Sequence, residues 1–272
     1  MNFPGSEFVS LHTYLILCPM LFLASFVDSV AGGGGLISIP SWLAAGFPVH
    51  FAYGTNKFTS GAAALSSSIR YFRSGKISLP VACFAAAGAL GGSWLGARLV
   101  LFLSDEVLRV TLLVLLPIVG TFTLLCRRNA PTEESPAMAL AENAEAEKKR
   151  FLSFLIGLVI GAYEGFFGPG SGTFLILAFN FLLGMELLTA CGTARLVNLA
   201  ANLAALLTFV AESRVVWEVA VPCALFSIAG GRFGARCAIT RGAKFVRPLM
   251  AFVMVLLFAK LLYDFCLKIK LI

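Results

Sequence analysis

The chain has 272 residues, of which 59% are hydrophobic and only 13% are charged, and its formal net charge is +7. This composition excludes an ordinary soluble domain and predicts an all-α, polytopic membrane protein. The basic residues lie mostly in loops, where membrane orientation and lipid headgroups account for them, so no nucleic-acid partner is expected. The seven cysteines stand singly along the chain. No pair of Cys or His residues has metal-ligand spacing, so neither a metal nor a cofactor is expected.

Eight apolar runs approach the length of about 20 residues that a helix needs to cross a bilayer. They lie near 11–31, 50–72, 77–103, 106–126, 151–167, 187–211, 215–239 and 245–267. Two shorter apolar pieces, 36–46 and 173–184, each follow a cluster of glycines. Glycines spaced four apart, as at Gly88, Gly92 and Gly96, predict close approach of helix backbones.

The glycine clusters predict two interrupted helices. The first is the run of four glycines in the stretch from Asp28 to Leu36, and the second lies between Glu164 and Gly172. Glycine is a poor helix former, and in hydrocarbon an irregular backbone is tolerated only where it is buried in protein or lines a wet cavity. Each cluster therefore predicts a broken or re-entrant helix at a binding site, although tight helix packing is a plain alternative.

The two clusters belong to a longer internal repeat. An offset of 136 residues pairs Asp28 with Glu164, and an offset of 138 pairs Lys57 with Arg195 and Gly96-Ala97-Arg98 with Gly234-Ala235-Arg236. Order and spacing both hold, which indicates a duplication. We expect a first transmembrane repeat at 1–126, a linker at 127–150 and a second transmembrane repeat at 151–272.

The distribution of Lys and Arg predicts the orientation of the chain in its membrane. Basic residues gather at 70–76, at both ends of the linker and at 236–247, so these segments are expected in the cytoplasm, with the N-terminus outside. The equivalent turns 98–109 and 236–247 would then lie on opposite faces, which predicts inverted repeats. A parallel arrangement of four plus four helices stays open, because Lys268 and Lys270 favour a cytoplasmic C-terminus.

The helices that follow the glycine clusters would direct unpaired N–H groups at an anion. Lys57 and Arg195 occupy equivalent positions inside spans, and an ionisable group there is a candidate functional residue. Asn198 and Asn202 share a helix face with Arg195. The expected substrate site combines both glycine clusters with both cationic helices: Gly33, Gly34, Gly35, Thr55, Asn56, Lys57, Gly170, Ser171, Gly172, Thr193, Arg195, Asn198 and Asn202.

Asp28 and Glu164 each precede a glycine cluster by four residues. Burial could raise the pKa of either carboxyl toward neutrality and make it a proton carrier for coupling. They could instead stay ionised as counter-ions to Lys57 and Arg195, or cap exposed amides of the break. The cations themselves could alternatively extend to an interface.

With these motifs in hand, the chain resembles the TauE/SafE family of sulfite exporters. The likeness rests on Asp28 to Pro40, Gly54-Thr55-Asn56-Lys57 and Gly96-Ala97-Arg98 together with their echoes in the second half, among which Ala194 departs from Asn56. It covers nearly the whole chain apart from the linker and the termini. The resemblance implies an inner-membrane permease for small sulfur oxyanions or organosulfonates such as sulfite or sulfoacetate, coupled to protons. The sequence leaves open whether the protein forms a homodimer.

Two other functions compete with that of an anion permease. A cation or metal permease would use Asp28 and Glu164 as ligands, and would lose its substrate when the acids are removed. An enzyme is not expected, because no nucleophile and base stand at useful spacing and no catalytic residue can be named.

Overall fold

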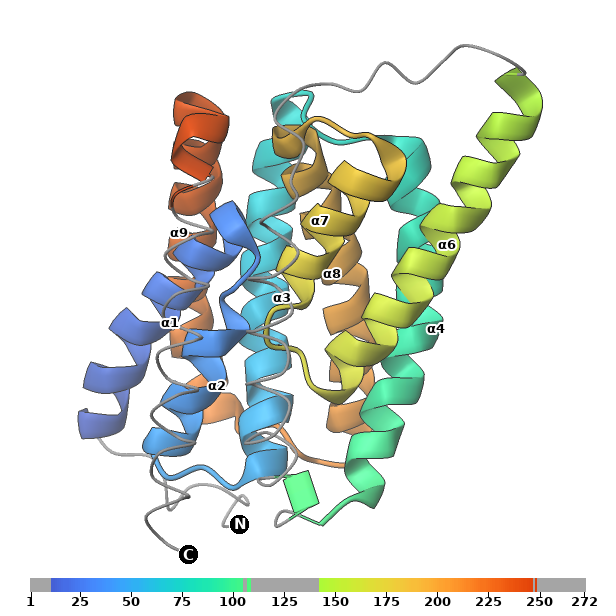
Figure 1. The fold of residues 1–272 in the computed structure, drawn as a ribbon. Coiled ribbons are helices and arrows are strands. Elements are labelled where there is room, and N and C mark those ends of the chain that lie inside the picture. Colours follow the sequence, from blue (N-terminus) through green and yellow to red (C-terminus); the bar gives the residue numbers. More distant parts are fainter. Residues whose placement is uncertain (1–10, 105–106, 109–141, 247, 249–272) are drawn as a thin grey trace, which may run out of the picture.

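The computed structural model describes residues 11–104, 107–108, 142–246 and 248, and every regular element among them is a helix (Figure 1). The prediction of an all-α fold is confirmed. The apolar runs 106–126 and 245–267 lie almost wholly outside the described residues, as does most of the linker expected at 127–150.

The helices follow the apolar runs closely. In the first half they are α1 (Leu11–Ala31), α2 (Gly35–Ala44), α3 (Val49–Arg73) and α4 (Leu79–Phe102). In the second half they are α6 (Glu142–Phe166), α7 (Ser171–Leu183), α8 (Leu187–Ala211) and α9 (Trp217–Arg241). Helix α6 therefore begins inside the segment that we expected to be linker. Residues 142–150 of that segment are helical.

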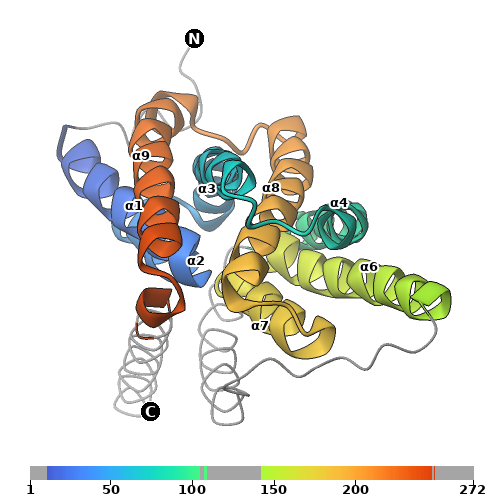
Figure 2. The same ribbon diagram turned by 90° about the horizontal axis from the view of Figure 1, so that it is seen from above.

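Two packed pairs of helices flank a central pair. Helix α4 packs along α6 and α1 along α9, while α3 and α8 lie between them (Figure 2). The glycines spaced four apart make the outer contacts close, because a Cβ on Gly92 would collide with the main-chain oxygen of Leu158. Gly234 of α9 lies in the same way against Phe26 of α1. The close backbone approach predicted from this spacing is confirmed.

The distribution of side chains is that of a protein surrounded by lipid. Leu207 and Leu225 are 70% and 65% exposed, whereas Lys57 and Arg195 are 2% and 1% exposed. Three described helices are long and apolar enough to cross a membrane, at Thr13–Ala31, Leu79–Phe102 and Leu187–Ala211. Helices α3, α6 and α9 are of comparable length but more polar, and α2 and α7 have only 10 and 13 residues.

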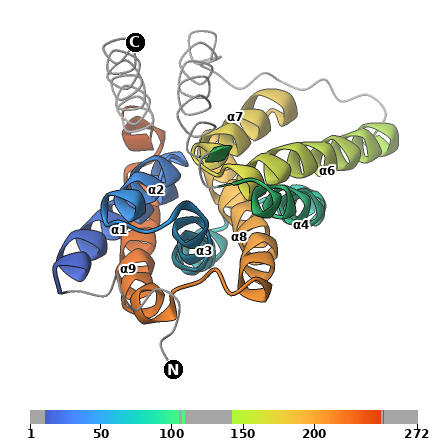
Figure 3. The same cartoon turned by 90° about the horizontal axis from the view of Figure 1, so that it is seen from below.

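The ends of the helices gather at the two ends of the bundle. At the top of Figure 1 lie the end of α3, the beginning of α6 and the end of α9; at the bottom lie the beginning of α1 and the end of α4. Helices α1, α3 and α9 run upward in that view, and α4, α6 and α8 run downward. Seen from below, α2 and α7 lie on the same side of the α3 and α8 pair (Figure 3).

Candidate functional site

The first glycine cluster separates α1 from α2. Helix α1 ends at Ala31, Gly32 has a φ of +82°, and α2 begins at Gly35. A positive φ disfavours any residue with a Cβ, and a Cβ on Gly32 would also collide with the main chain of Gly172. The Thr173 hydroxyl donates a hydrogen bond to the Ala31 oxygen at 2.8 Å. The two glycine clusters, far apart in the sequence, are therefore in direct contact.

The second glycine cluster separates α6 from α7 in the same manner. Helix α6 ends at Phe166 and α7 begins at Ser171, with Gly168 and Gly170 at φ values of +89° and +84° between them. A Cβ on Gly35 would lie 2.9 Å from the Pro169 Cα. A larger residue in place of Gly35 would therefore prevent this close approach of the two breaks.

Each cation of the predicted site is paired with the acid from the other half of the chain. The Lys57 ammonium lies 2.7 Å from a Glu164 carboxylate oxygen and 2.5 Å from the Glu164 main-chain oxygen. The Arg195 Nη1 donates to Asp28 Oδ2. The side chains of Lys57 and Arg195 are almost fully buried, whereas that of Asp28 is 22% exposed. The positive charge of both cations is therefore balanced locally.

Both carboxylates also hold the glycine breaks. Asp28 Oδ1 accepts the Gly34 N–H at 3.0 Å, and the Ser171 hydroxyl donates to Glu164 Oε2. Both acids thus stand as counter-ions to the cations, and Asp28 also accepts an amide of its break. Their role as proton carriers stays a prediction.

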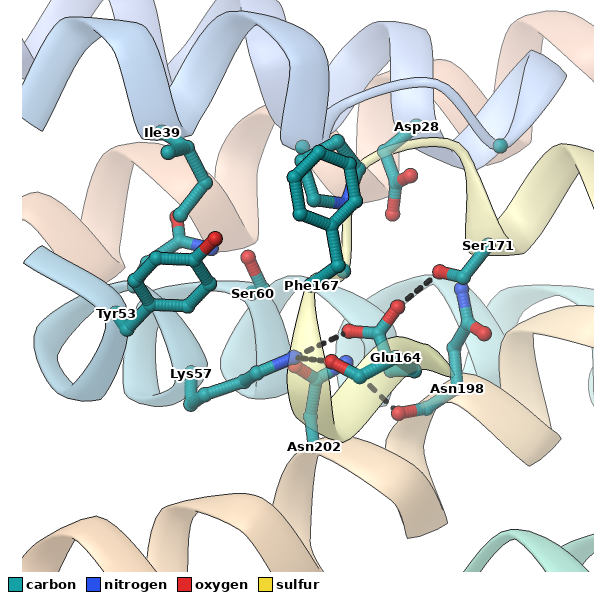
Figure 4. Close-up of a pocket in the computed structure, with 15 residues that line it drawn as sticks. Asp28, Ile39, Tyr53, Lys57, Ser60, Glu164, Phe167, Ser171, Asn198 and Asn202 are labelled. Atoms are coloured by element: carbon teal, nitrogen blue, oxygen red, sulfur yellow. Dashed lines mark hydrogen bonds and ion pairs between the residues drawn. The ribbon is translucent and has the colours of Figure 1, made fainter. Parts of the chain in front are cut away.

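A small cavity opens where the breaks meet α3 and α8 (Figure 4). The side chains of Lys57 and Glu164 meet in its wall, and the Asp28 carboxylate points toward it from α1. Its walls carry both signs of charge, and many of its polar groups are amides or hydroxyls. The lining residues are Asp28, Gly32, Gly35, Ile39, Tyr53, Asn56, Lys57, Ser60, Glu164, Phe167, Gly168, Pro169, Ser171, Asn198 and Asn202.

The cavity collects about half of the residues predicted for the site. Those that line it are Asp28, Gly35, Asn56, Lys57, Glu164, Ser171, Asn198 and Asn202. Those outside its lining are Gly33, Gly34, Thr55, Gly170, Gly172, Thr193 and Arg195. Of this second group, Gly34, Gly172 and Arg195 still touch the ion pairs or the breaks.

Thr55 and Thr193 have a different environment from the one we expected. The Thr55 hydroxyl accepts the Val216 N–H at 3.1 Å, and the Thr193 hydroxyl accepts the Ser78 N–H at the same distance. Each threonine thus anchors the residue that precedes α9 or α4. Their hydroxyls hold the helix framework rather than the cavity wall.

The ion pair with Asp28 does not use all the hydrogen-bond donors of Arg195. Its Nε and Nη2 are buried and have no hydrogen-bond partner among the described residues, although a buried guanidinium N–H is costly to leave unpaired. The missing Cβ of Gly172 lets Nη2 lie close against that residue. The Oδ1 atoms of Asn198 and Asn202, on the same helix, are also buried and find no partner within the described ranges. Nε and Nη2 form the edge of the guanidinium that binds two oxygens in parallel.

Some lining residues were not predicted from the sequence. Tyr53 lies one helical turn before Lys57, so helical spacing could have found it. Ile39 and Phe167 are ordinary apolar residues by pattern, and only the folded chain brings them to the cavity. Gly168 and Pro169 lie inside the second glycine cluster, which marks the segment but not which of its residues face inward.

Comparison with known proteins identifies the family of the chain. The profile of the family described as sulfite exporter TauE/SafE matches residues 17–261. The chain belongs to this family. It is 34% identical over 251 residues to the probable membrane transporter protein YfcA of Escherichia coli K12, covering 92% of this chain and 89% of YfcA. No solved structure matches the chain.

Further relatives have the same kind of name. A probable membrane transporter protein of Haemophilus influenzae is 33% identical over 248 residues, with 89% of this chain and 92% of the relative covered. The probable membrane transporter protein ORF9 of a Sinorhizobium species is 34% identical over 260 residues, with 94% and 95% covered. The chain is thus a multi-pass membrane transporter and not an enzyme.

Proposed function

We propose that the protein is a secondary transporter that moves small sulfur-containing oxyanions or organosulfonates, such as sulfite or sulfoacetate, across the inner membrane. The observation that carries the proposal is the unpaired Nε and Nη2 edge of Arg195, buried where the two glycine breaks meet. A sulfite or sulfonate group has three oxygens, so two of them can accept parallel charge-assisted hydrogen bonds from this edge.

The substrate would also draw on groups that line the cavity. Lys57 supplies a second positive charge, and Asn56, Asn198, Asn202 and Ser171 supply neutral hydrogen-bonding groups. In the described conformation Glu164 and Asp28 occupy the two cations. An anion therefore has to displace at least one carboxylate from its partner, which links substrate binding to a rearrangement of the breaks.

Inverted repeats would determine how this rearrangement takes place. In support, contacts recur at the 138-residue offset: Gly54 lies against the Arg214 oxygen as Gly192 lies against the Lys76 oxygen, and the contacts of Thr55 and Thr193 match in the same way. The equivalent helices α3 and α8 run in opposite directions (Figure 1). We propose alternating access in which one repeat rocks against the other and the glycine breaks repack.

Proton coupling fits the same ion pairs. When an anion takes Arg195 or Lys57, the carboxylate left behind is buried and uncompensated, and a buried unpaired charge is unfavourable. Uptake of a proton by Asp28 or Glu164 would remove that charge. Binding of the anion would then favour binding of a proton, which is the linkage that a coupled transporter requires.

The basic segments indicate how the protein is oriented in the membrane. The residues that end α3, begin α6 and end α9 are rich in Lys and Arg, and these helix ends share one end of the bundle (Figure 1). The positive-inside rule assigns that end to the cytoplasm, with the first residues of α1 toward the outside.

A binding screen tests the proposed function. Purified protein is mixed with sulfite, sulfoacetate, taurine, sulfate or divalent metal ions, and thermal unfolding is recorded for the wild type, Lys57→Ala and Arg195→Ala. We expect at least one sulfur anion to stabilise the wild type and to lose its effect in Arg195→Ala. Stabilisation by metals alone, lost when Asp28 or Glu164 is replaced, would instead support a cation permease.

A further inference from the structure

A second cavity shares Asp28 with the first one. Its described lining includes five hydroxyl side chains, contributed by α1, α2, α3 and α9, and the Asp28 carboxylate. These hydroxyl residues are Ser25, Ser38, Thr59, Ser60 and Ser227. Asp28, Gly35 and Ser60 line both cavities, and Asp28 and Ser60 are labelled in Figure 4.

Two of these hydroxyls lack partners. Ser38 and Ser227 are 3% and 1% exposed, and their Oγ atoms are buried with no hydrogen-bond partner among the described residues. A hydroxyl that loses water on burial without gaining a partner is unfavourable. Both nevertheless border the same small space, from α2 and from α9. The shared position of these unpaired oxygens indicates a ligand that accepts several oxygen contacts at once.

The charge of the lining decides the class of ligand. The described residues around this space contribute one carboxylate and no positive side chain. An anion would be repelled by Asp28. Oxygen-only lining suits a hard cation, and a single carboxylate is too little charge for a typical Ca²⁺ or Mg²⁺ site. No described group of three or more His, Cys, Asp or Glu side chains could hold a transition metal.

We propose that this hydroxyl-lined cavity binds Na⁺. The ion would take Ser38 Oγ and Ser227 Oγ as ligands beside Asp28, with the remaining hydroxyls completing its shell. Gly34 and Gly35, at the beginning of α2, complete the wall of this space.

The site gives Asp28 a second compensating charge. Asp28 is paired with Arg195 in the described conformation. Resting on the proposed function, we infer that Na⁺ already bound beside Asp28 keeps this carboxylate compensated when the anion draws Arg195 away, and that it competes with a proton for that role. Anion and Na⁺ would then bind cooperatively through one carboxylate.

Na⁺ binding can be tested with no anionic substrate present. Thermal unfolding of the purified full-length protein is measured in NaCl, KCl and N-methylglucamine chloride at equal ionic strength. We expect a saturable rise in Tm with Na⁺ only, of about 5–10 °C at a hundred times the Kd. Equal Tm values in the three salts would overturn the proposal.

Serine variants locate the effect. Ser38→Ala and Ser227→Ala should lower the apparent Na⁺ affinity by about tenfold or more. Ser68→Ala is the matched control, because Ser68 is a buried serine outside this cavity whose hydroxyl has no partner in the described part of the chain. Should a serine variant fail to fold, Thr59→Val replaces it. An equal loss in Ser68→Ala, or none in the cavity variants, would contradict the site.

This result separates the two proposals. A protein that responds to Na⁺ but not to any sulfur anion keeps the cation site and loses the proposed function. A protein that binds sulfite through Arg195 in the absence of any Na⁺ effect keeps the function and loses the cation site.

Discussion

Two ion pairs, Lys57 with Glu164 and the partly buried pair of Arg195 with Asp28, join the two halves of the chain at the centre of the bundle. Each joins a cation on a long central helix to an acid that comes just before a glycine break. Removing one member of a buried pair leaves a charge without compensation and typically costs about 3–5 kcal/mol. Replacing both members with neutral groups is often far less harmful.

The pair of Lys57 and Glu164 therefore predicts a double-mutant cycle. Lys57→Met and Glu164→Gln should each lower the unfolding temperature of the purified protein strongly, because each leaves a buried charge. The double variant should be more stable than either single variant. Thermal unfolding in detergent measures all four proteins, and additive losses would argue that the two side chains are not coupled in the membrane protein.

Arg195 is expected to separate stability from binding. Arg195→Lys keeps a positive charge opposite Asp28, but an ammonium cannot present the two-donor edge of a guanidinium. We expect the Tm without ligand to change little and the affinity for sulfite or sulfoacetate to fall about 10- to 100-fold, as expected for losing charge-assisted hydrogen bonds. Unchanged affinity by equilibrium binding would mean that the Nε and Nη2 edge does not hold the anion.

The charged residues of the site could be predicted from the sequence, but the ion pairs that they form could not. Spacing alone matched Lys57 with Arg195 and Asp28 with Glu164, because equivalent positions recur at fixed offsets. It left open that each cation pairs with the acid of the other half, since that depends on how α3 and α8 cross α6 and α1 in space. The hydrogen bonds of Thr55 and Thr193 could not be predicted for the same reason: their partners Val216 and Ser78 lie far along the chain.

At the scale of the elements, glycine spacing sets how closely helices approach. Gly92 of α4 lies against Leu158 of α6, whereas its neighbour Gly91 has no atom near its missing Cβ. The helix bounds themselves were largely predictable, because apolar runs and glycine clusters mark them. The start of α6 at Glu142 was less so, since a charged Ala/Glu-rich stretch is compatible with a helix or a solvated tether.

These adjacent glycines make a matched pair of variants. Gly92→Ala should destabilise the protein by about 1–3 kcal/mol, because the new methyl group forces α4 and α6 apart. Gly91→Ala should be neutral or stabilising by up to about 1 kcal/mol, since alanine is the better helix former. Thermal unfolding of both proteins checks the difference, and equal effects would contradict the close packing of the two helices.

At the scale of the whole molecule, opposite directions of equivalent helices bear on topology. The turn after α3 and the turn after α8 stand at opposite ends of the bundle in Figure 1. The sequence left both inverted and parallel arrangements open, because loop charges favour one and Lys268 and Lys270 the other. A bundle of this kind puts both glycine breaks at mid-depth, between the ends that carry the loops.

Cysteine labelling tests that topology in cells. Ser74 and Glu212 are exposed and occupy equivalent turns. In a background without reactive native cysteines, Ser74→Cys and Glu212→Cys should react with a membrane-impermeant maleimide from opposite faces of the membrane, with Glu212→Cys labelled from outside. Labelling of both from one face would rule out inverted repeats.

Transport by the purified protein tests the central claim most directly. Uptake of labelled sulfite is measured in proteoliposomes that contain the wild type, Arg195→Gln or Arg98→Gln. Arg98 is an exposed arginine that stacks on Trp94, so its variant is the control. We predict saturable uptake by the wild type and Arg98→Gln, and none above empty liposomes for Arg195→Gln. Undiminished uptake by Arg195→Gln would contradict an anion site built on the guanidinium between the two glycine breaks.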